Sequence, residues 1–442
     1  MILQPEIHNS LRLPSKQSEA GIFATKNTMN AHIIAIGDEL LIGQVINTNA
    51  AWLGEKLTEI GIHVDKMLVI PDEETAIVDQ LEKSCAEASI VIVSGGLGPT
   101  KDDITKTGIC RFLGSSMVFN EDVYQLILNY LKRQGREPNP LIREHCYFPK
   151  ETVFLKNNMG TAPGMAYRYK DALIISVPGV PYEMRFIMEN EGIELIKALD
   201  DGQIILSKTI LTAGEFEARL AHRIQDITDA MPAHISIAFL PNINQVRLRL
   251  TIRGTDQVSM EKKLNEFVNR IEERLGNQVF GHGKESLSEV VGKLLVKNDL
   301  TMSTAESCTG GFLAHKITEI PGSSAYYCGS IISYSNELKM NLLDVKRETL
   351  ESVGAVSEET VCEMVAGLLE KTGTDIAVAV SGIAGPDGGT AEKPVGTIWL
   401  ACGNREKTVA KKIILAKDRL KNIEGAAMHA LDMLRHFILS EY

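Results

Sequence analysis

The chain has 442 residues, of which 44% are hydrophobic and 23% charged, a composition typical of globular proteins with two to four domains. Its 46 basic and 57 acidic residues give a net charge of −11, which argues against a mainly nucleic-acid-binding protein. No segment approaches the roughly 18 uninterrupted apolar residues of a membrane helix. The 7 cysteines show no CxxC spacing, which argues against disulfides and structural zinc. We therefore expect a cytoplasmic protein without membrane or nucleic-acid partners.

Residues 1–29 precede the first apolar pattern of the chain. They contain neither the apolar core nor the cleavage signature of a secretory signal. The apolar pattern begins directly after Met29 and Asn30. We expect residues 1–29 to be a disordered extension or an incorrectly assigned start of the chain.

Strands and helices are expected to alternate from His32 onward. Residues 32–36 form an apolar strand, and Asn49 is placed to cap a helix that ends at Gly61. A strand over 62–70, another helix and a continuous apolar strand over 90–93 follow. This alternation predicts parallel, right-handed βαβ layers, and hence a three-layer α/β/α domain over residues 30–199.

The loop over residues 94–103 follows an apolar strand and opens a helix. Its glycines, Gly95, Gly96 and Gly98, let the backbone approach an anion, which the amides at a helix N-terminus attract. The alternative is a glycine turn followed by a capping box formed by Thr100 and Asp103. That alternative accounts for these two residues but not for the glycines.

Four carboxylates are expected at the same edge of the sheet as this loop. Asp38 and Glu39 follow the first strand, and Asp102 and Asp103 end the glycine loop. Ligands of open α/β sheets bind at the carboxyl ends of the strands. The combination suggests a divalent cation such as Mg²⁺ that bridges a diphosphate.

The sequence pattern changes after residue 199, and residues 200–281 are predicted to form a small α+β domain. The segment from Gln245 to Arg253 alternates apolar residues with arginines, and a helix with one apolar face follows. We interpret the arginines as a solvated strand face, because no aromatic residues alternate with them. The apolar strand residues are Val246, Leu248, Leu250 and Ile252, the arginines are Arg247, Arg249 and Arg253, and the helix face is Leu264, Phe267, Ile271 and Leu275.

A second three-layer α/β/α domain is expected over residues 285–442, where strand–helix alternation returns. Within it, Ser335 or Asn336 can cap a helix whose first turn contains Lys339. The helix dipole and partial burial would lower the pKa of Lys339. A neutral amine can take a proton from a serine, directly or through Tyr334, as in Ser–Lys hydrolases. The alternative is an ordinary surface lysine.

The residue types leave open which serine would be the nucleophile, with Ser307, Ser323 and Ser324 as candidates. Cys308 is a competing nucleophile, but no histidine lies close in sequence to activate its thiol. The loop over residues 381–389 follows a buried strand and is rich in glycine, which favours a phosphate or ribose cradle. The glycines of this proposed cradle are Gly382, Gly385, Gly388 and Gly389.

With these motifs in view, residues 30–442 resemble the competence/damage-inducible protein (CinA) family. The N-terminal motifs are Gly37 to Gly43 with Asn47, the 94–103 loop, Gly160 to Met165 and Pro178 to Met184. They are similar to the family's molybdopterin-binding-like domain. The resemblance implies an ADP-ribose pyrophosphatase that gives AMP and ribose 5-phosphate and depends on a divalent metal, with K⁺ as a second candidate ion. It implies ADP-ribose contacts by Gly95, Gly96, Gly98, Thr100 and Asn47, and metal ligation by Asp38, Glu39, Asp102 and Asp103.

The middle and C-terminal segments resemble the other two domains of this family. Residues 200–281 are similar to its KH-like domain but lack a GxxG loop. Residues 305–397 are similar to nicotinamide-nucleotide amidohydrolase, which converts nicotinamide mononucleotide (NMN) to nicotinate mononucleotide and ammonia through an acyl-serine. The resemblance implies Ser324 as nucleophile, activated by Tyr334 and Lys339. It implies an acyl site with backbone oxyanion donors at Ser307, Cys308 and Ser381, and NMN phosphate and ribose contacts by Gly382, Gly385, Gly388 and Gly389.

The expected function is therefore a bifunctional enzyme of pyridine-nucleotide recycling, with no cofactor in the C-terminal domain. We expect a homodimer whose partners are small nucleotides. The alternative from a different class is a pterin- or nucleotide-binding scaffold in competence or the DNA damage response.

Overall fold

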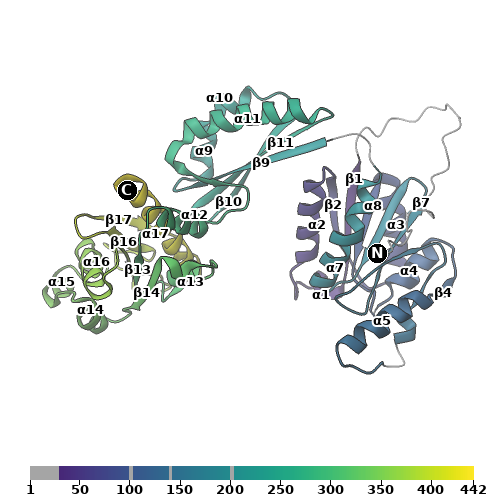
Figure 1. Cartoon of the computed structure of the whole chain (residues 1–442), viewed down its shortest axis with the longest axis horizontal. Coiled ribbons are helices and arrows are strands. Elements are labelled where there is room, and N and C mark those ends of the chain that lie inside the picture. The colour runs from purple at the N-terminus through teal and green to yellow at the C-terminus, as the bar shows by residue number, and fades with distance from the viewer. Residues whose placement is uncertain (1–28, 99–102, 139–141, 200–203) are drawn as a thin grey trace, which may run out of the picture. The chain divides into compact units, whose positions relative to one another are not determined.

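The computed structural model in Figure 1 describes residues 29–98, 103–138, 142–199 and 204–442. The predictions for residues 1–28, Thr100 and Asp102 lie outside the described residues. The chain divides into two compact units, Met1–Gln203 and Ile204–Tyr442. Each unit is described by itself below.

The first unit contains a six-stranded sheet with the order β2-β1-β3-β8-β7-β6. The strands β2, β1, β3 and β8 are parallel, whereas β7 and β6 run antiparallel. The prediction of wholly parallel layers is therefore corrected at this edge, because a hairpin that turns at Lys170, with φ of 54°, joins β7 to β8. The strands are β1 (Asn30–Ile36), β2 (His63–Ile70), β3 (Ile90–Ser94), β6 (Val153–Leu155), β7 (Gly164–Tyr169) and β8 (Ala172–Val177), beside a separate hairpin of β4 (Met117–Phe119) and β5 (Tyr147–Pro149).

Helices cover both faces of this sheet (Figure 1). The helices α2, α7 and α8 pack on one face, and α3, α4 and α5 on the other, so that each face has its own apolar core. The predicted three-layer arrangement of this unit is confirmed. The helices are α1 (Asp38–Leu41), α2 (Thr48–Glu59), α3 (Glu74–Glu87), α4 (Thr105–Phe112), α5 (Glu121–Arg133), α6 (Ile142–His145), α7 (Pro181–Ile187) and α8 (Ile193–Lys197).

The second unit begins with an antiparallel sheet of order β10-β11-β9-β12. The predicted alternation is confirmed, because Val246, Leu248, Leu250 and Ile252 of β11 are buried against the apolar face of α11. The strands are β9 (Ile204–Ala213), β10 (Ile235–Asn242), β11 (Gln245–Gly254) and β12 (Val279–His282), and the helices are α9 (Glu217–Arg223), α10 (Gln225–Asp229) and α11 (Gln257–Leu275).

A five-stranded sheet of order β14-β13-β15-β16-β17 forms the rest of the second unit. The strands β14, β13 and β15 are parallel, and β16 and β17 are antiparallel. The strands are β13 (Met302–Glu306), β14 (Tyr327–Ile332), β15 (Ile376–Gly382), β16 (Thr397–Gly403) and β17 (Thr408–Ile414). The helices are α12 (Leu287–Lys297), α13 (Phe312–Thr318), α14 (Asn336–Leu343), α15 (Arg347–Ser352), α16 (Glu358–Thr372) and α17 (Arg419–Glu441).

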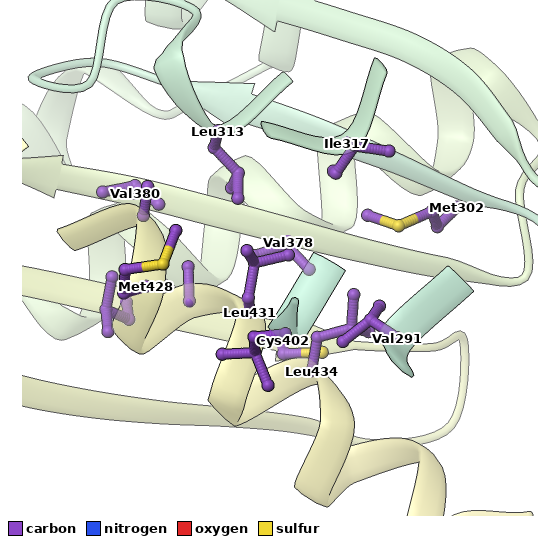
Figure 2. Close-up of a cluster of buried hydrophobic side chains, with 14 of the residues drawn as sticks. Val291, Met302, Leu313, Ile317, Val378, Val380, Cys402, Met428, Leu431 and Leu434 are labelled. Atoms are coloured by element: carbon purple, nitrogen blue, oxygen red, sulfur yellow. The ribbon is translucent and has the colours of Figure 1, made fainter. Parts of the chain in front are cut away.

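The faces of this sheet carry separate cores. Figure 2 shows side chains of α12, α13 and α17 packed against β13, β15 and β16 on one face, and α14 and α16 cover the other. Leu211 of β9 and Phe280 of β12 belong to the first of these cores, which joins the antiparallel sheet to the C-terminal layers. The predicted fold class, two three-layer α/β/α domains with a small α+β domain between them, is confirmed. Within the described residues, no helix is long and apolar enough to span a membrane.

Candidate active sites

Lys339 lies at the carboxyl edge of the C-terminal sheet and is 1% exposed. Ser335 caps α14 by accepting a hydrogen bond from the N–H of Leu338. Of the two predicted cap residues, Ser335 and Asn336, the structure therefore shows Ser335. The Nζ of Lys339 lies 3.0 Å from Ser307 Oγ, 2.8 Å from the carbonyl oxygen of Ser333 and 3.5 Å from that of Tyr334. The structure therefore brings together Lys339 and one of the candidate serines, Ser307.

Burial of the Lys339 side chain lowers its pKa to about 8. The direction is the one predicted from the sequence, and desolvation is its cause. A neutral amine has two N–H groups and one lone pair. It can donate to the carbonyls of Ser333 and Tyr334 and still accept the hydroxyl proton of Ser307. The geometry thus suits a base that removes a proton from this serine.

Ser324 lies apart from Lys339 in this chain, so its role as nucleophile stays a prediction. It lies in an exposed 3-10 turn, Ser323–Ala325, that precedes β14. β14 runs parallel to β13, with Tyr327 opposite Met302 and Ile332 opposite Glu306. Ser324 is therefore at the amino end of these strands and Lys339 at the carboxyl end, roughly 15–20 Å away along a strand of this length. The resemblance rests on sequence motifs, which do not show how β13 and β14 pair and therefore do not show the distance between Ser324 and Lys339.

Tyr334 reaches the site through its main chain. Its carbonyl oxygen faces Lys339 Nζ, whereas its side chain is 60% exposed and its hydroxyl accepts a hydrogen bond from Arg419 Nη2 at 3.2 Å. Arg419 also donates from Nη1 to the carbonyl of Gly385 at 2.6 Å. Sequence reasoning missed Arg419, although its place directly after the helix cap Asp418 is a recognisable signal.

Glu306 fixes the loop that carries Ser307. It is fully buried at the end of β13, and its carboxylate accepts hydrogen bonds from the N–H groups of Gly311, Leu313 and Ala314 at 2.8–3.1 Å. It thereby satisfies the otherwise unpaired amides at the start of α13. Sequence reasoning missed this role as well. Glu306 looks like the first polar residue after an apolar strand, and its bonds to the amides of α13 appear only in the folded loop.

Two amides near Ser307 are available as hydrogen-bond donors. Among the residues that the structure describes, the N–H groups of Cys308 and Thr309 have no main-chain acceptor, whereas the N–H of Ser307 is bonded to Val380 O. Amides of this kind, next to a nucleophile, can stabilise an oxyanion. The main-chain N–H of Cys308 is therefore a candidate oxyanion donor, whereas that of Ser307 is already bonded.

Cys308 and Ser381 are held in the interior. Burial raises the pKa of the Cys308 thiol to about 12, so its thiolate is not accessible at neutral pH. The Ser381 hydroxyl is 1% exposed and donates to Ala355 O at 2.6 Å. This bond joins the end of β15 to the segment before α16, so the hydroxyl has a structural partner.

The loop over residues 381–389 has packing reasons for several of its glycines. A Cβ at Gly382 would contact the side chain of Ile398, and one at Gly385, where φ is +94°, would contact Val395. Gly389 likewise approaches the backbone of Val395. A Cβ at Gly388 would have room, but φ there is +87°, a backbone conformation that favours glycine. Phosphate and ribose binding by this loop therefore stays a prediction.

The first unit contains a cavity of about 390 Å³ at the carboxyl edge of its sheet. Its walls are the predicted glycine loop, the segment after β8 and carboxylates from several elements. A Cβ at Gly95, where φ is +120°, would clash with the carbonyl oxygen of Ile36, which explains a glycine there. The residues that line the cavity include Gly37, Glu39, Asp72, Gly95, Gly96, Gly98, Asp103, Gly179 and Glu183.

The helix cap predicted at Asn49 is provided by Asn47. Asn47 is the cap of α2, since its Oδ1 accepts from the N–H of Ala50 at 2.9 Å. Asn49 is buried and donates from Nδ2 to Ser94 Oγ at 3.0 Å and to Gly179 O at 2.8 Å. The prediction of Asn49 as the cap is wrong, and contact of Asn47 with ADP-ribose stays a prediction.

The predicted capping box at the glycine loop is also corrected. α4 begins at Thr105, two residues after Asp103, and its N-cap Ile104 has no side-chain hydrogen bond to the helix. Thr105 instead donates from Oγ1 to the carbonyl of Gly95 at 2.9 Å. Asp103 therefore lies in the loop that lines the cavity.

The acidic residues around this cavity influence one another. Asp72, which sequence reasoning missed, accepts a hydrogen bond from the N–H of Asp38 at 3.0 Å. Burial raises the pKa of Asp72, and the negative charges of Asp38, Glu39 and Asp103 add to that effect. In the described ranges, however, no group of three or more histidine, cysteine or acidic side chains is close enough to hold a metal ion. A cation here would need ligands from its substrate or from water.

Three family models match successive parts of the chain. The "Probable molybdopterin binding domain" matches residues 32–198, the "Damage-inducible protein CinA KH domain" residues 207–281, and the "CinA C-terminal domain" residues 284–438. These ranges follow the sheets described above.

Relatives of similar length match over most of the chain. A CinA-like protein of Cytophaga hutchinsonii is 40% identical over 411 residues, which are 92% of this chain and 98% of that protein. A CinA-like protein of Chloroherpeton thalassium is 40% identical over 418 residues, 93% of this chain and 99% of that protein. Among solved structures, competence/damage inducible protein CihA of Agrobacterium tumefaciens is 38% identical and covers 34% of this chain and 96% of its own, with a TM-score of 0.33.

Proposed function

The chain belongs to the CinA family, and from this premise we propose that its C-terminal domain hydrolyses the carboxamide of NMN, with Ser307 as the nucleophile. The products are nicotinate mononucleotide and ammonia. The observation that carries the proposal is the distance of 3.0 Å between Lys339 Nζ and Ser307 Oγ. On this basis we propose Ser307 in place of Ser324 as the nucleophile, and we keep Lys339 as the base.

The first half of the reaction forms an acyl-enzyme. Neutral Lys339 accepts the hydroxyl proton of Ser307, and Oγ attacks the carboxamide carbon of NMN. The negative charge on the carboxamide oxygen is stabilised by the N–H groups of Cys308 and Thr309. The C–N bond then breaks, and the Lys339 ammonium returns its proton to the leaving nitrogen, so ammonia departs and Lys339 is neutral again.

The second half uses the same residues. Lys339 takes a proton from a water molecule, whose oxygen attacks the acyl carbon. The bond to Ser307 Oγ breaks, and the proton returns to this oxygen. The product leaves as the carboxylic acid, which loses its proton to the solvent to become the carboxylate, and both side chains are restored.

Arg419 is the candidate group for the negatively charged part of the substrate. It lies at the start of α17, between the Tyr334 hydroxyl and the carbonyl of Gly385. A guanidinium beside a glycine-rich loop suits a phosphate monoester such as that of NMN. We therefore keep the 381–389 loop as the proposed contact for phosphate and ribose.

The proposed amidase is tested by ammonia release from NMN. We expect Ser307→Ala to abolish release with an unchanged far-UV spectrum, and Ser324→Ala to retain wild-type rates. Activity that survived in Ser307→Ala but was lost in Ser324→Ala would restore Ser324 as the nucleophile.

For the first unit we propose hydrolysis of ADP-ribose to AMP and ribose 5-phosphate in the 390 Å³ cavity. The glycine loop would contact the diphosphate, and one or two of Asp38, Glu39, Asp72 and Asp103 would hold Mg²⁺ together with the substrate phosphates and water, as this ion prefers. The metal would neutralise the diphosphate. The contribution of the chain is a set of oxygen ligands, among which burial first, and then the negative charges of Asp38, Glu39 and Asp103, raise the pKa of Asp72.

Incubation of the purified chain with ADP-ribose separates this proposal from a scaffold function. Formation of AMP that stops on addition of a chelator supports a metal-dependent pyrophosphatase. A pterin- or nucleotide-binding scaffold would yield neither AMP from ADP-ribose nor ammonia from NMN.

A further inference from the structure

A second large cavity lies within the second unit, between the antiparallel sheet and the C-terminal layers. It has a volume of about 600 Å³, within the range of sites for small molecules. We call it the junction cavity. Its walls come from the end of β9, the turn after α11, β17 and the second half of α17.

The charged groups of the junction cavity leave one positive charge uncompensated. Arg435, 2% exposed, donates from Nε and Nη2 to Asp432 Oδ1 at 3.1 and 2.8 Å. It also donates from Nη2 to Asn277 O at 2.7 Å. The carboxylate of Asp432 is thus neutralised by its buried neighbour. Lys411, by contrast, has no carboxylate within ion-pair distance in the part of the chain that the structure describes.

Two imidazoles face the same space as Lys411. Burial lowers the pKa of His429 to about 4 and also lowers that of His436; the charge of Lys411 acts in the same direction on both, and the carboxylate of Asp432 opposes it. Both rings are therefore neutral near pH 7, and each provides an N–H donor. His436 Nε2 lies 2.9 Å from Arg435 Nη2. Because a guanidinium only donates, Nε2 is the acceptor and the ring proton is on Nδ1.

The remaining walls combine apolar side chains with the polar Asn277, Gln278 and Ser440. Val409, Met433, Phe437 and Leu439 line the cavity beside the basic groups. Positive and N–H donor groups next to apolar side chains suit a ligand with an anionic end and a flat ring. The reaction site at Ser307 does not include any of these residues.

We propose that the junction cavity binds a small molecule that carries a phosphate group and a flat ring, of the size of a mononucleotide. Lys411 and the two imidazoles contact the phosphate, and the ring lies against the apolar wall. The ligand contacts residues of both the antiparallel sheet and the C-terminal layers, so its binding stabilises their junction. This inference is independent of the activities proposed above.

AMP serves as the probe, in isothermal titration calorimetry of the full-length protein. We expect the wild type to bind AMP in the junction cavity, and Lys411→Ala to weaken this binding at least tenfold. His436→Gln, which keeps an acceptor for Arg435, is expected to weaken it as well. Adenosine and inorganic phosphate, titrated separately, should each bind more weakly than AMP. Any AMP that binds elsewhere on the chain, including the cavity of the first unit, should remain in every variant and is thereby distinguished.

Lys412→Ala is the matched control, since Lys412 follows Lys411 on the opposite face of β17. Its titration should equal that of the wild type. The proposal is overturned if Lys411→Ala binds AMP as the wild type does, or if Lys412→Ala weakens binding as much as Lys411→Ala. Equal affinities for AMP and inorganic phosphate would overturn the ring contact.

Discussion

Lys339 combines burial with two carbonyl acceptors, and this combination determines its chemistry. A charged ammonium at this position loses hydration, which lowers its pKa to about 8. The carbonyls of Ser333 and Tyr334 hold the two N–H groups of the neutral amine. Its lone pair is then directed by geometry to Ser307, which lies 32 positions earlier in the sequence.

A pH profile tests the role of Lys339. The active form is the neutral amine, so kcat/KM for NMN should rise with pH through a midpoint near 8 and fall about tenfold per unit below it. Lys339→Arg should be inactive throughout, because a guanidinium stays protonated. A rate that is constant between pH 6 and pH 9 would contradict general-base catalysis by this residue.

Tyr334→Phe separates the two proposed roles of this tyrosine. The substitution removes the hydrogen bond to Arg419 but keeps the main-chain carbonyl that faces Lys339. We expect kcat for NMN to fall less than about tenfold, whereas loss of a proton relay would cost about 10²–10⁴-fold. Steady-state kinetics decide between them, and a loss in the larger range would return the Tyr334 hydroxyl to the proton path.

At the scale of elements, α13 depends on one buried side chain. Glu306 ends β13 and accepts hydrogen bonds from three amides at the start of this helix. The intervening segment contains Ser307 and the candidate oxyanion donors. The position of the nucleophile is therefore set by the contact between a strand end and a helix start.

Glu306→Gln should destabilise the fold and the reaction together. An amide accepts through one oxygen only, so buried N–H groups lose their partner, at a cost of about 1–3 kcal/mol in the free energy of unfolding. Denaturant unfolding and NMN kinetics measure both effects. Glu319→Gln, on an exposed carboxylate that follows α13, is the control and should change the free energy of unfolding by less than about 0.5 kcal/mol. Equal stability of the two variants would contradict the role of Glu306.

The elements themselves could largely be predicted, because apolar periodicity is a local property. The strands before Ser94, Ser307 and Ser381, and the apolar face of α11, follow directly from it. The antiparallel β7 and the late start of α4 could not be predicted, since a hairpin at Lys170 and the side-chain bond of Thr105 to Gly95 depend on tertiary packing. The choice of Ser307 over Ser324 required the register of β13 and β14.

On the scale of the whole molecule, the two proposed reactions belong to separate compact units. The cavity with Asp103 lies in the first unit and Lys339 in the second. Loss of one activity is therefore not expected to impair the other.

Asp103→Asn tests this separation. We expect ADP-ribose cleavage to fall by about 10–100-fold or more, since a candidate metal ligand is lost, while NMN deamidation stays unchanged. A helix-cap role, which the start of α4 at Thr105 already argues against, would alter stability alone. Pyrophosphatase activity that resisted both the substitution and a chelator would refute the metal site.

The acyl-enzyme provides the most direct measurement of the central claim, that Ser307 is the nucleophile. NMN turnover is quenched with acid and the protein is digested, and the peptides are analysed by mass spectrometry. The account predicts the mass of the nicotinate mononucleotide acyl group on the peptide that contains Ser307, and none on the peptide that contains Ser324. An acyl group on Ser324, with Ser307 unmodified, would contradict it.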